Sequence, residues 1–203
     1  MMKKYIVNIL AHILFKVLNS ESYSLYEKKY WKDWGKKYFK SFGEGASLPK
    51  LHIIKNAKYI KIGDNFSALS NLRIEAWDLF YGEKFKPEIT IGNNVFLNTD
   101  VHIGAINKIS IGNDVLIASR VFISDHSHGQ STACDLAIAP SRRPLYSKGP
   151  VIIGDNVWIG EGVCILPGVT IGDNCIIGAN SVVNKSFAPN SIIAGIPAKN
   201  IKK

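Results

Sequence analysis

Aliphatic residues recur at every sixth position through most of the chain. The first regular series falls on Ile91, Leu97, Ile103, Ile111, Ile117 and Ile123, with a two-residue slip before Ile111. After a gap the series returns on Ile153, Ile159, Ile165, Ile171, Ile177 and Val183, and a weaker version precedes both on Ile62, Ala68 and Ile74. Glycine often follows the aliphatic residue, and turn-forming pairs such as Asp-Asn come next.

This period predicts short strands joined by tight turns. A helical period of 3.6 would drift away from a six-residue repeat, and simple alternation does not explain why turn residues return at every sixth place. A triangular coil fits, with one strand per hexapeptide and turns stacked about 4.8 Å apart, the spacing of parallel strands. The sequence therefore predicts an all-β fold, a parallel β-helix over residues 49–203, preceded by a short α-helical segment in residues 1–48.

The N-terminal segment combines an apolar run with a cluster of aromatic residues and lysines. Residues 6–18 are too short for a transmembrane helix, which needs about 20 apolar residues, and Asn8, His12 and Lys16 form one polar stripe on a helix. Residues 23–42 then interleave aromatic rings with lysines. Two interpretations stay open: these rings pack on the β-helix or on a neighbouring subunit, or the segment binds a membrane surface.

Charge and cysteine content narrow the possible partners. The net charge is +9, but the first fifty residues contain ten lysines against four acidic residues and so carry +6 of it. The nearly balanced remainder argues against a nucleic-acid groove on the main domain. Three cysteines form neither an even set for disulfides nor a metal-binding spacing, so we expect no metal site and a reducing cytoplasm.

The repeat stops for 27 residues between Ile123 and Val151. An irregular excursion of this length from a compact solenoid is typical of a functional loop. It opens with the motif Asp-His-Ser-His-Gly, in which His126 and His128 are the only close pair of imidazoles in the chain. We therefore expect the functional site at the base of this excursion, residues 124–150.

Two stretches resemble a known family. The ending NVWIGEGVCILPGVTIGDNCIIGANSVVNKSFAPNSIIAGIPAKNIKK is similar to that of the hexapeptide-repeat acyltransferases, which include galactoside, maltose, serine and streptogramin acetyltransferases. The stretch INKISIGNDVLIASRVFISDHSHG resembles bacterial O-antigen and exopolysaccharide O-acetyltransferases in particular. The resemblance covers residues 60–203. It implies a left-handed β-helix, a homotrimer with active sites shared between subunits, and acetyl-CoA as co-substrate.

The resemblance also implies roles for residues around the acceptor. His126 takes the place of the general base, for which an imidazole suits because its ordinary pKa is about 6.5. Asn98 matches an asparagine whose amide can donate to a developing oxyanion. Asp100, His102 and His128 are expected to contact the sugar. Galactoside-type enzymes carry an acidic acceptor contact where this chain has Ile106, so a different acceptor pocket is implied.

For acetyl-CoA the resemblance implies a groove between two subunits that is lined mainly by backbone. The residues expected there are Trp158, Gly160, Glu161, Gly178, Ala179, Asn184, Lys185, Lys199 and Lys202. The lysines lie near the nucleotide end, where positive charge favours phosphate, although an arginine pairs with phosphate more strongly.

The expected function is therefore O-acetyl transfer from acetyl-CoA to a sugar hydroxyl of a lipopolysaccharide O-antigen or another surface polysaccharide precursor. The expected location is cytoplasmic, with attachment to the inner face of the membrane through residues 1–48 as the open point. The alternatives are an N-acetyltransferase acting on an amino or nucleotide sugar, a zinc-dependent carbonic anhydrase of the same repeat type, and a scaffold without activity.

Overall fold

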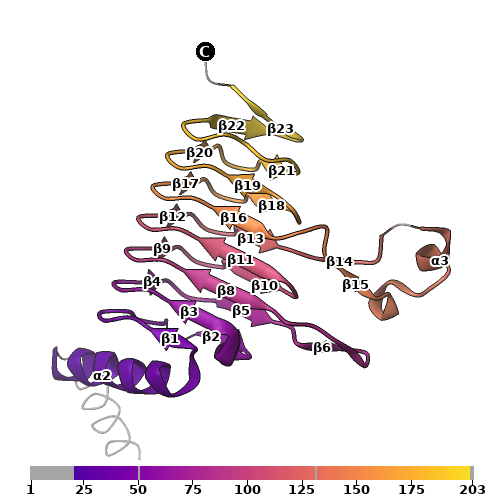
Figure 1. Ribbon diagram of the computed structural model, residues 1–203. Coiled ribbons are helices and arrows are strands. Elements are labelled where there is room, and N and C mark those ends of the chain that lie inside the picture. The colour runs from indigo at the N-terminus through magenta and orange to yellow at the C-terminus, as the bar shows by residue number, and fades with distance from the viewer. Residues whose placement is uncertain (1–20, 50, 131, 202–203) are drawn as a thin grey trace, which may run out of the picture.

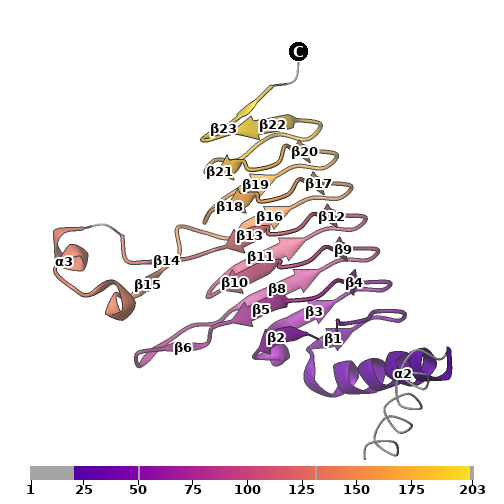
Figure 2. The same cartoon turned by 180° about the vertical axis from the view of Figure 1, so that it is seen from behind.

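The computed structural model describes residues 21–49, 51–130 and 132–201, and the side chains of residues 21–28 and 31 lie outside that description. The chain winds into a tapering three-sided prism with an excursion arm on one side (Figures 1 and 2). The predicted apolar helix over residues 6–18 lies outside the described residues. Nowhere in the described part does a helix have the length and apolar character needed to cross a membrane.

Three parallel sheets form the faces of the prism, here called sheets A, B and C. Sheet A consists of β1 (Ser41–Phe42), β3 (Ile60–Ile62), β8 (Glu88–Ile91), β11 (Lys108–Ile111), β16 (Val151–Ile153) and β19 (Thr170–Ile171). Sheet B consists of β2 (His52–Lys55), β5 (Leu72–Ala76), β10 (His102–Ala105), β13 (Phe122–Ser124), β18 (Cys164–Ile165) and β21 (Val182–Val183). Sheet C consists of β4 (Ser67–Ala68), β9 (Phe96–Leu97), β12 (Leu116–Ile117), β17 (Trp158–Ile159), β20 (Ile176–Ile177), β22 (Ile192–Gly195) and the antiparallel β23 (Ala198–Asn200).

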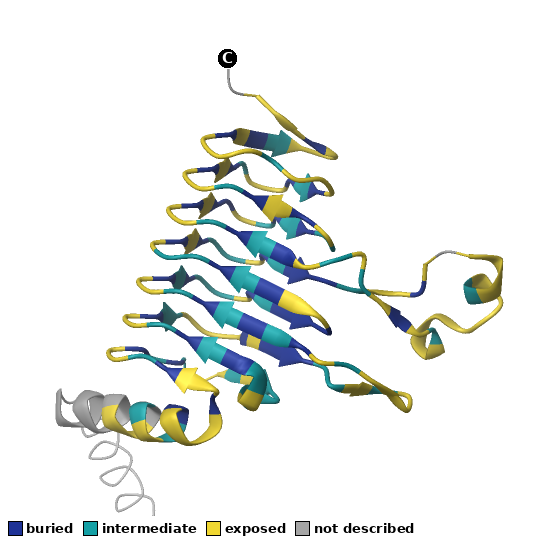
Figure 3. Ribbon diagram, viewed as in Figure 1, coloured by how far each residue is buried: buried dark blue, intermediate teal, exposed yellow. Residues whose placement is uncertain are grey.

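The core lies inside the prism, where the predicted aliphatic residues form one column on each sheet (Figure 3). In sheet A, for example, Ile91 pairs with Ile111, which pairs with Ile153 in the next coil. All twelve residues of the two regular series are at most 1% exposed. The prediction of stacked hexapeptide strands around an aliphatic core is confirmed.

The corners explain the turn residues of the repeat. Asn65, Asn94, Asp114, Asn156 and Asn174 all have φ near +55°, a left-handed conformation that asparagine and aspartate tolerate better than most residues. Their side chains also bond from coil to coil, as in the 2.9 Å hydrogen bond from Asn94 Nδ2 to Asp114 Oδ1. Each corner is thereby tied to the next one.

At Gly112 the stacking leaves no room for a side chain. A Cβ on this residue would lie 2.7 Å from the Gly154 carbonyl group and 2.4 Å from Asp155 Oδ1 in the next coil. We expect Gly112→Ala to lower the free energy of unfolding by about 1–3 kcal/mol, because the backbone of two coils would have to separate. Chemical denaturation checks this, with Ser110→Ala on the outer face of β11 as the matched control; equal stability of the two variants would contradict it.

Helix α2 (Glu21–Tyr38) runs across the N-terminal end of the prism (Figure 1). Phe39 and Phe42 after the helix are 6% exposed, and Trp34 packs against the same core. These rings close the end of the β-helix, as one of the two interpretations of the aromatic cluster expects. Tyr30 and Tyr38 remain 48% and 46% exposed on the helix.

Candidate active site

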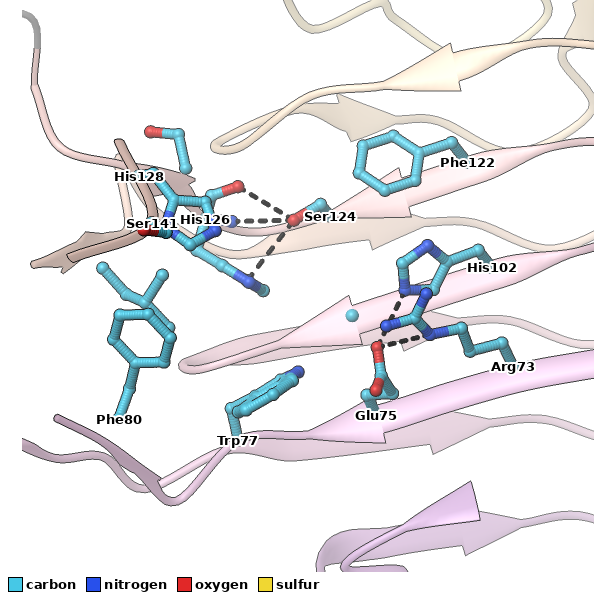
Figure 4. A pocket seen from close by; sticks show the side chains of 13 residues that line it. Arg73, Glu75, Trp77, Phe80, His102, Phe122, Ser124, His126, His128 and Ser141 are labelled. Atoms are coloured by element: carbon cyan, nitrogen blue, oxygen red, sulfur yellow. Dashed lines mark hydrogen bonds and ion pairs between the residues drawn. The ribbon is translucent and has the colours of Figure 1, made fainter. Parts of the chain in front are cut away.

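Two irregular segments leave the prism at the same corner, where sheet B passes into sheet A. The hairpin of β6 (Leu79–Phe80) and β7 (Glu83–Lys84) follows β5, and the longer excursion follows β13. The excursion contains β14 (Ser127–His128), β15 (Leu145–Tyr146), α3 (Ala133–Leu136) and the 3-10 turn Pro140–Arg142. Between the two segments, the outer face of sheet B carries a cavity of about 480 Å³ (Figure 4).

His126 stands at the base of the excursion with its orientation fixed by Asp125. The Asp125 carboxylate is fully buried and accepts the backbone N–H groups of Ile106 and Asn107 at 2.9 and 2.8 Å. The same group lies 3.0 Å from His126 Nδ1. Because a carboxylate surrounded by donors acts as the acceptor, we assign the proton to Nδ1. Nε2 then carries the free lone pair of a general base.

Ser124 adds a second constraint on His126. Its hydroxyl donates to the His126 carbonyl oxygen at 2.9 Å and accepts the His126 backbone N–H at 3.2 Å. The hydroxyl oxygen also lies 3.3 Å from His126 Nδ1. The ring is 14% exposed, so it is held in place and still reached from the cavity.

Three charged or polar side chains form a network on the floor of the cavity. Glu75 Oε2 accepts from Arg73 Nε at 2.7 Å and from His102 Nε2 at 3.1 Å (Figure 4). Burial lowers the pKa of His102, and the charge of Arg73 lowers it further, while the hydrogen bond and charge of Glu75 act in the opposite direction. His102 is therefore neutral at pH 7 and donates through Nε2.

The titration of His102 follows from this network. We expect its pKa to lie below the ordinary value of about 6.5, to fall further in Glu75→Gln and to rise in Arg73→Gln. Since the folded protein then binds this proton less readily than the unfolded chain, the contribution of His102 to stability is intact above about pH 6.5. It is lost progressively as the pH falls from there to the folded pKa. An NMR titration of the imidazole checks this, and a midpoint at or above the ordinary value would contradict it.

His126 also borders a second cavity, of about 890 Å³, on the side facing the C-terminal coils. Gln130, Tyr146, Lys148, Leu166 and Asn184 line that space together with His126 and Ser124. His126 thus stands between two spaces that open on opposite sides of one imidazole. Such an arrangement suits a reaction between two bound molecules in which a proton is taken from one of them.

The residues expected in the site fall into two sets at opposite edges of sheet B. His126 and His128 follow β13, and Asn184 and Lys185 follow β21, all at the edge toward sheet A. The other set lies at the edge toward sheet C: Asn98 and Asp100 follow β9, Gly160 and Glu161 follow β17, and Gly178 and Ala179 follow β20. One chain by itself therefore brings His126 together with His102 and His128 and does not bring it together with Asn98 or Asp100.

Several of these residues have additional structural contacts. Asp100 has φ +60° and accepts from Asn71 Nδ2 at 2.9 Å, so it is also a turn residue. The missing Cβ of Gly160 faces the next coil, where it would lie 2.7 Å from Ala179 N. In contrast, the backbone N–H groups of Glu161 and Ala179 donate to no other described residue. Trp158 is 52% exposed on the outer face of sheet C, Lys199 is exposed in β23, and Lys202 lies outside the described residues.

Sequence reasoning missed Arg73, Glu75, Trp77, Phe80 and Ser124, which line the cavity beside His126. One signal was present, since the six-residue period also breaks between Ile74 and Ile91. That break is the β6–β7 hairpin, which carries Phe80 into the cavity wall. Its ring lies 5.5 Å from that of His128.

A metal-dependent site finds no support in the part of the chain that the structure describes. There, no three or more His, Cys, Asp or Glu side chains gather closely enough to hold a metal ion. His52, one of the histidines considered for zinc, lies 2.6 Å through Nδ1 from the carbonyl oxygen of Pro49. His102 instead bonds to Glu75.

Known proteins share both the repeat and the sequence of this chain. Residues 150–185 match the family model of the bacterial transferase hexapeptide (six repeats). Over 154 residues the chain is 44% identical to WbbJ of Escherichia coli (strain K12), which is provisionally named a lipopolysaccharide biosynthesis O-acetyl transferase, and the match covers 74% of each chain.

Solved structures share the fold. A maltose O-acetyltransferase from Clostridium difficile 630 is 27% identical with a TM-score of 0.51, over 92% of this chain and 90% of that one. AntD, an N-acyltransferase from Bacillus cereus solved with dTDP-4-amino-4,6-dideoxyglucose and Coenzyme A, is 23% identical with a TM-score of 0.65, over 84% and 87%. The likeness to AntD concerns the fold alone. With the parallel sheets and the repeat, these matches confirm the expected left-handed β-helix.

Proposed function

This chain belongs to the hexapeptide-repeat acyltransferase family, and on that premise we propose that it transfers acetyl from acetyl-CoA to a sugar hydroxyl of a lipopolysaccharide O-antigen or another surface polysaccharide precursor. The observation that carries the proposal is His126, whose Nε2 is left free by the bond of Nδ1 to Asp125 and which stands between two cavities. The 44% identity to WbbJ supports the acceptor class.

In the proposed reaction His126 Nε2 accepts the proton of the sugar hydroxyl while the hydroxyl oxygen attacks the thioester carbonyl. The imidazolium that forms is stabilised by the Asp125 carboxylate at Nδ1. Collapse of the tetrahedral intermediate breaks the carbon–sulfur bond, and His126 returns the proton to the departing thiolate. The enzyme itself forms no covalent bond to the acetyl group.

We further propose a homotrimer in which the sheet-B edge that carries Asn98 lies against the His126 edge of the next subunit. Support comes from the way in which the expected residues divide between two edges of one chain. The acetyl-CoA groove would then run between subunits, with the N–H groups of Glu161 and Ala179 as donors and Asn184 and Lys185 on the facing edge. Asn98 would donate to the oxyanion.

Subunit mixing tests this arrangement. His126→Ala and Asn98→Ala trimers should each have little activity, whereas mixed trimers should regain part of it. Some interfaces in a mixed trimer pair an intact His126 with an intact Asn98. Mixtures no more active than the parent variants, or a monomeric mass by light scattering, would refute a shared site.

A membrane contact through α2 is also proposed, at the cytoplasmic face. Lys29, Lys36 and Lys37 are exposed on this helix beside the half-exposed Tyr30 and Tyr38, a combination that suits an anionic lipid surface. Because Trp34 and the residues after α2 close the core, charge reversal is a better test than truncation. We expect the full chain to float with anionic liposomes and the Lys29/Lys36/Lys37→Glu variant to sediment. The matched control reverses Lys84, Lys86 and Lys199, and equal flotation of both variants would contradict the proposal.

The acceptor class is tested in the organism that makes this protein. Mass spectrometry of the surface glycan from a deletion strain should show the loss of an acetyl ester, restored by the wild-type gene and not by the His126→Ala gene. An unchanged glycan would overturn the assignment to surface polysaccharide.

A further inference from the structure

The cavity between the hairpin and the excursion has a floor that the proposed chemistry does not use. His126 takes the proton, yet Glu75 and Trp77 also face this space, one coil or more away from His126 (Figure 4). Its volume of about 480 Å³ lies within the range of pockets that bind small ligands. The inference drawn from these residues rests on the proposed function, because it concerns the acceptor of that reaction.

Glu75 presents an unused acceptor in a nearly buried position. Its side chain is 8% exposed, and both of its partners, Arg73 and His102, bond to the same oxygen, Oε2. The other oxygen, Oε1, accepts no hydrogen bond from any described residue. A nearly buried carboxylate oxygen without a donor is costly, since buried polar groups are almost always satisfied. A hydroxyl donor in the cavity would satisfy it.

Trp77 supplies a flat apolar surface beside this carboxylate. The ammonium of Lys55 lies 3.0 Å from the centre of the indole ring. Lys55 belongs to β2, which pairs with β5 on the side away from β10 and His126, so it covers the far face of the ring. The indole also lines the cavity, where Figure 4 shows it nearly edge-on below His126. An aromatic face beside a hydrogen-bonding edge matches a sugar ring, which has an apolar C–H face and a rim of hydroxyls.

Gly104 keeps the space between Glu75 and His126 open. It lies in register with Glu75 in the neighbouring strand. A Cβ at this position would lie 3.5 Å from His126 Cε1 and 3.6 Å from His102 Nε2, in the gap between the two imidazoles. With glycine there, a ligand can reach from the carboxylate to the base.

We propose that Glu75 and Trp77 form the acceptor subsite, in which a neutral pyranose stacks on Trp77 and donates one hydroxyl to Glu75 Oε1. A different hydroxyl of the same sugar then lies at His126 Nε2. Glu75 is thus a specificity-determining residue that selects a hydroxyl donor next to the acetylated position. It also supplies a carboxylate to the site, although Ile106 stands where galactoside-type relatives carry their acid.

Sugar binding to the intact protein tests the subsite. The probes are the methyl glycosides of glucose, galactose, mannose and rhamnose, and the readout is fluorine NMR of protein labelled with fluorotryptophan. The chain has four tryptophans, and Trp77→Phe assigns the resonance of Trp77. We expect at least one glycoside to shift this resonance saturably. Glu75→Gln, which keeps the shape of the side chain, should weaken the binding by about tenfold to a hundredfold.

Matched controls lie on the same hairpin. Glu83→Gln removes an exposed carboxylate and Tyr81→Ala removes a ring that is 72% exposed, and neither residue lines the cavity. Both variants should bind the glycoside like the wild type. If no glycoside shifts the Trp77 resonance, or if Glu75→Gln binds as tightly as the wild type, the subsite proposal is overturned.

The same variants separate this inference from the proposed function. Saturable binding at Trp77 by a protein that transfers no acetyl to any sugar would support the subsite and contradict the acetyltransferase proposal. Acetyl transfer with an unchanged acceptor KM in both Glu75→Gln and Trp77→Ala would support the function and overturn the subsite.

Discussion

Replacing His126 by alanine is expected to lower the rate of acetyl transfer by about 10²–10⁴-fold, the usual contribution of a general base. The reason is that Nε2 of this ring faces the cavity while Nδ1 is held by Asp125, and no other described imidazole combines these two features. Steady-state transfer from acetyl-CoA, followed by release of the CoA thiol, measures the loss.

His128→Ala is the matched control for this variant. His128 belongs to the same motif and lines the same cavities, but its printed ring contact is with Phe80 at the rim. We expect its loss to change the acceptor KM more than the turnover. Thermal unfolding should be the same for both variants, since neither ring lies in the core. Turnover near that of the wild type in His126→Ala would remove this residue from its role.

Asp125→Asn is expected to reduce both turnover and stability. Three donors point at the buried carboxylate: the N–H groups of Ile106 and Asn107, and His126 Nδ1. An amide has one acceptor oxygen, so its NH₂ group must face at least one of them. We expect turnover to fall on the order of 10²-fold because the imidazolium loses its partner and its fixed tautomer. The unsatisfied group should lower the free energy of unfolding by about 1–3 kcal/mol.

The control for that variant is Asp114→Asn. Asp114 is an exposed corner residue whose carboxylate accepts from Asn94 Nδ2, and asparagine already occupies the equivalent place in other coils. This change should leave turnover and denaturation midpoint unaltered. An Asp125→Asn protein as active and stable as Asp114→Asn would show that the buried carboxylate neither orients His126 nor holds the corner.

The fold followed from the sequence because each coil of the β-helix is a local repeat. The position of an aliphatic residue in its hexapeptide decides whether it points inward, and for this reason Ile103 and Ile123 could be placed in the core without knowledge of distant contacts. His126 followed from the same rule in reverse, since it stands where the repeat first fails in the region of the family motif.

The acceptor cavity did not follow from the sequence, because it depends on which coils become neighbours. Glu75 and His102 are 27 residues apart and meet only because the β6–β7 hairpin is inserted between β5 and β8 without disturbing the register of sheet B. The hairpin length cannot be read as register from one sequence. The role of Asp125 was open for the same reason, because its partners Ile106 and Asn107 come from the preceding coil.

The central claim is that His126 directs acetyl from acetyl-CoA onto a sugar oxygen, and the bond formed tests it most directly. Purified protein is incubated with radiolabelled acetyl-CoA and the deacetylated surface glycan of a deletion strain, and the labelled glycan is then treated with mild hydroxylamine. Label that is transferred by the wild type, lost with hydroxylamine and absent with His126→Ala is the predicted result, since an O-acetyl ester is cleaved and an amide is not. Label that resists hydroxylamine, or no label on the glycan, would contradict it.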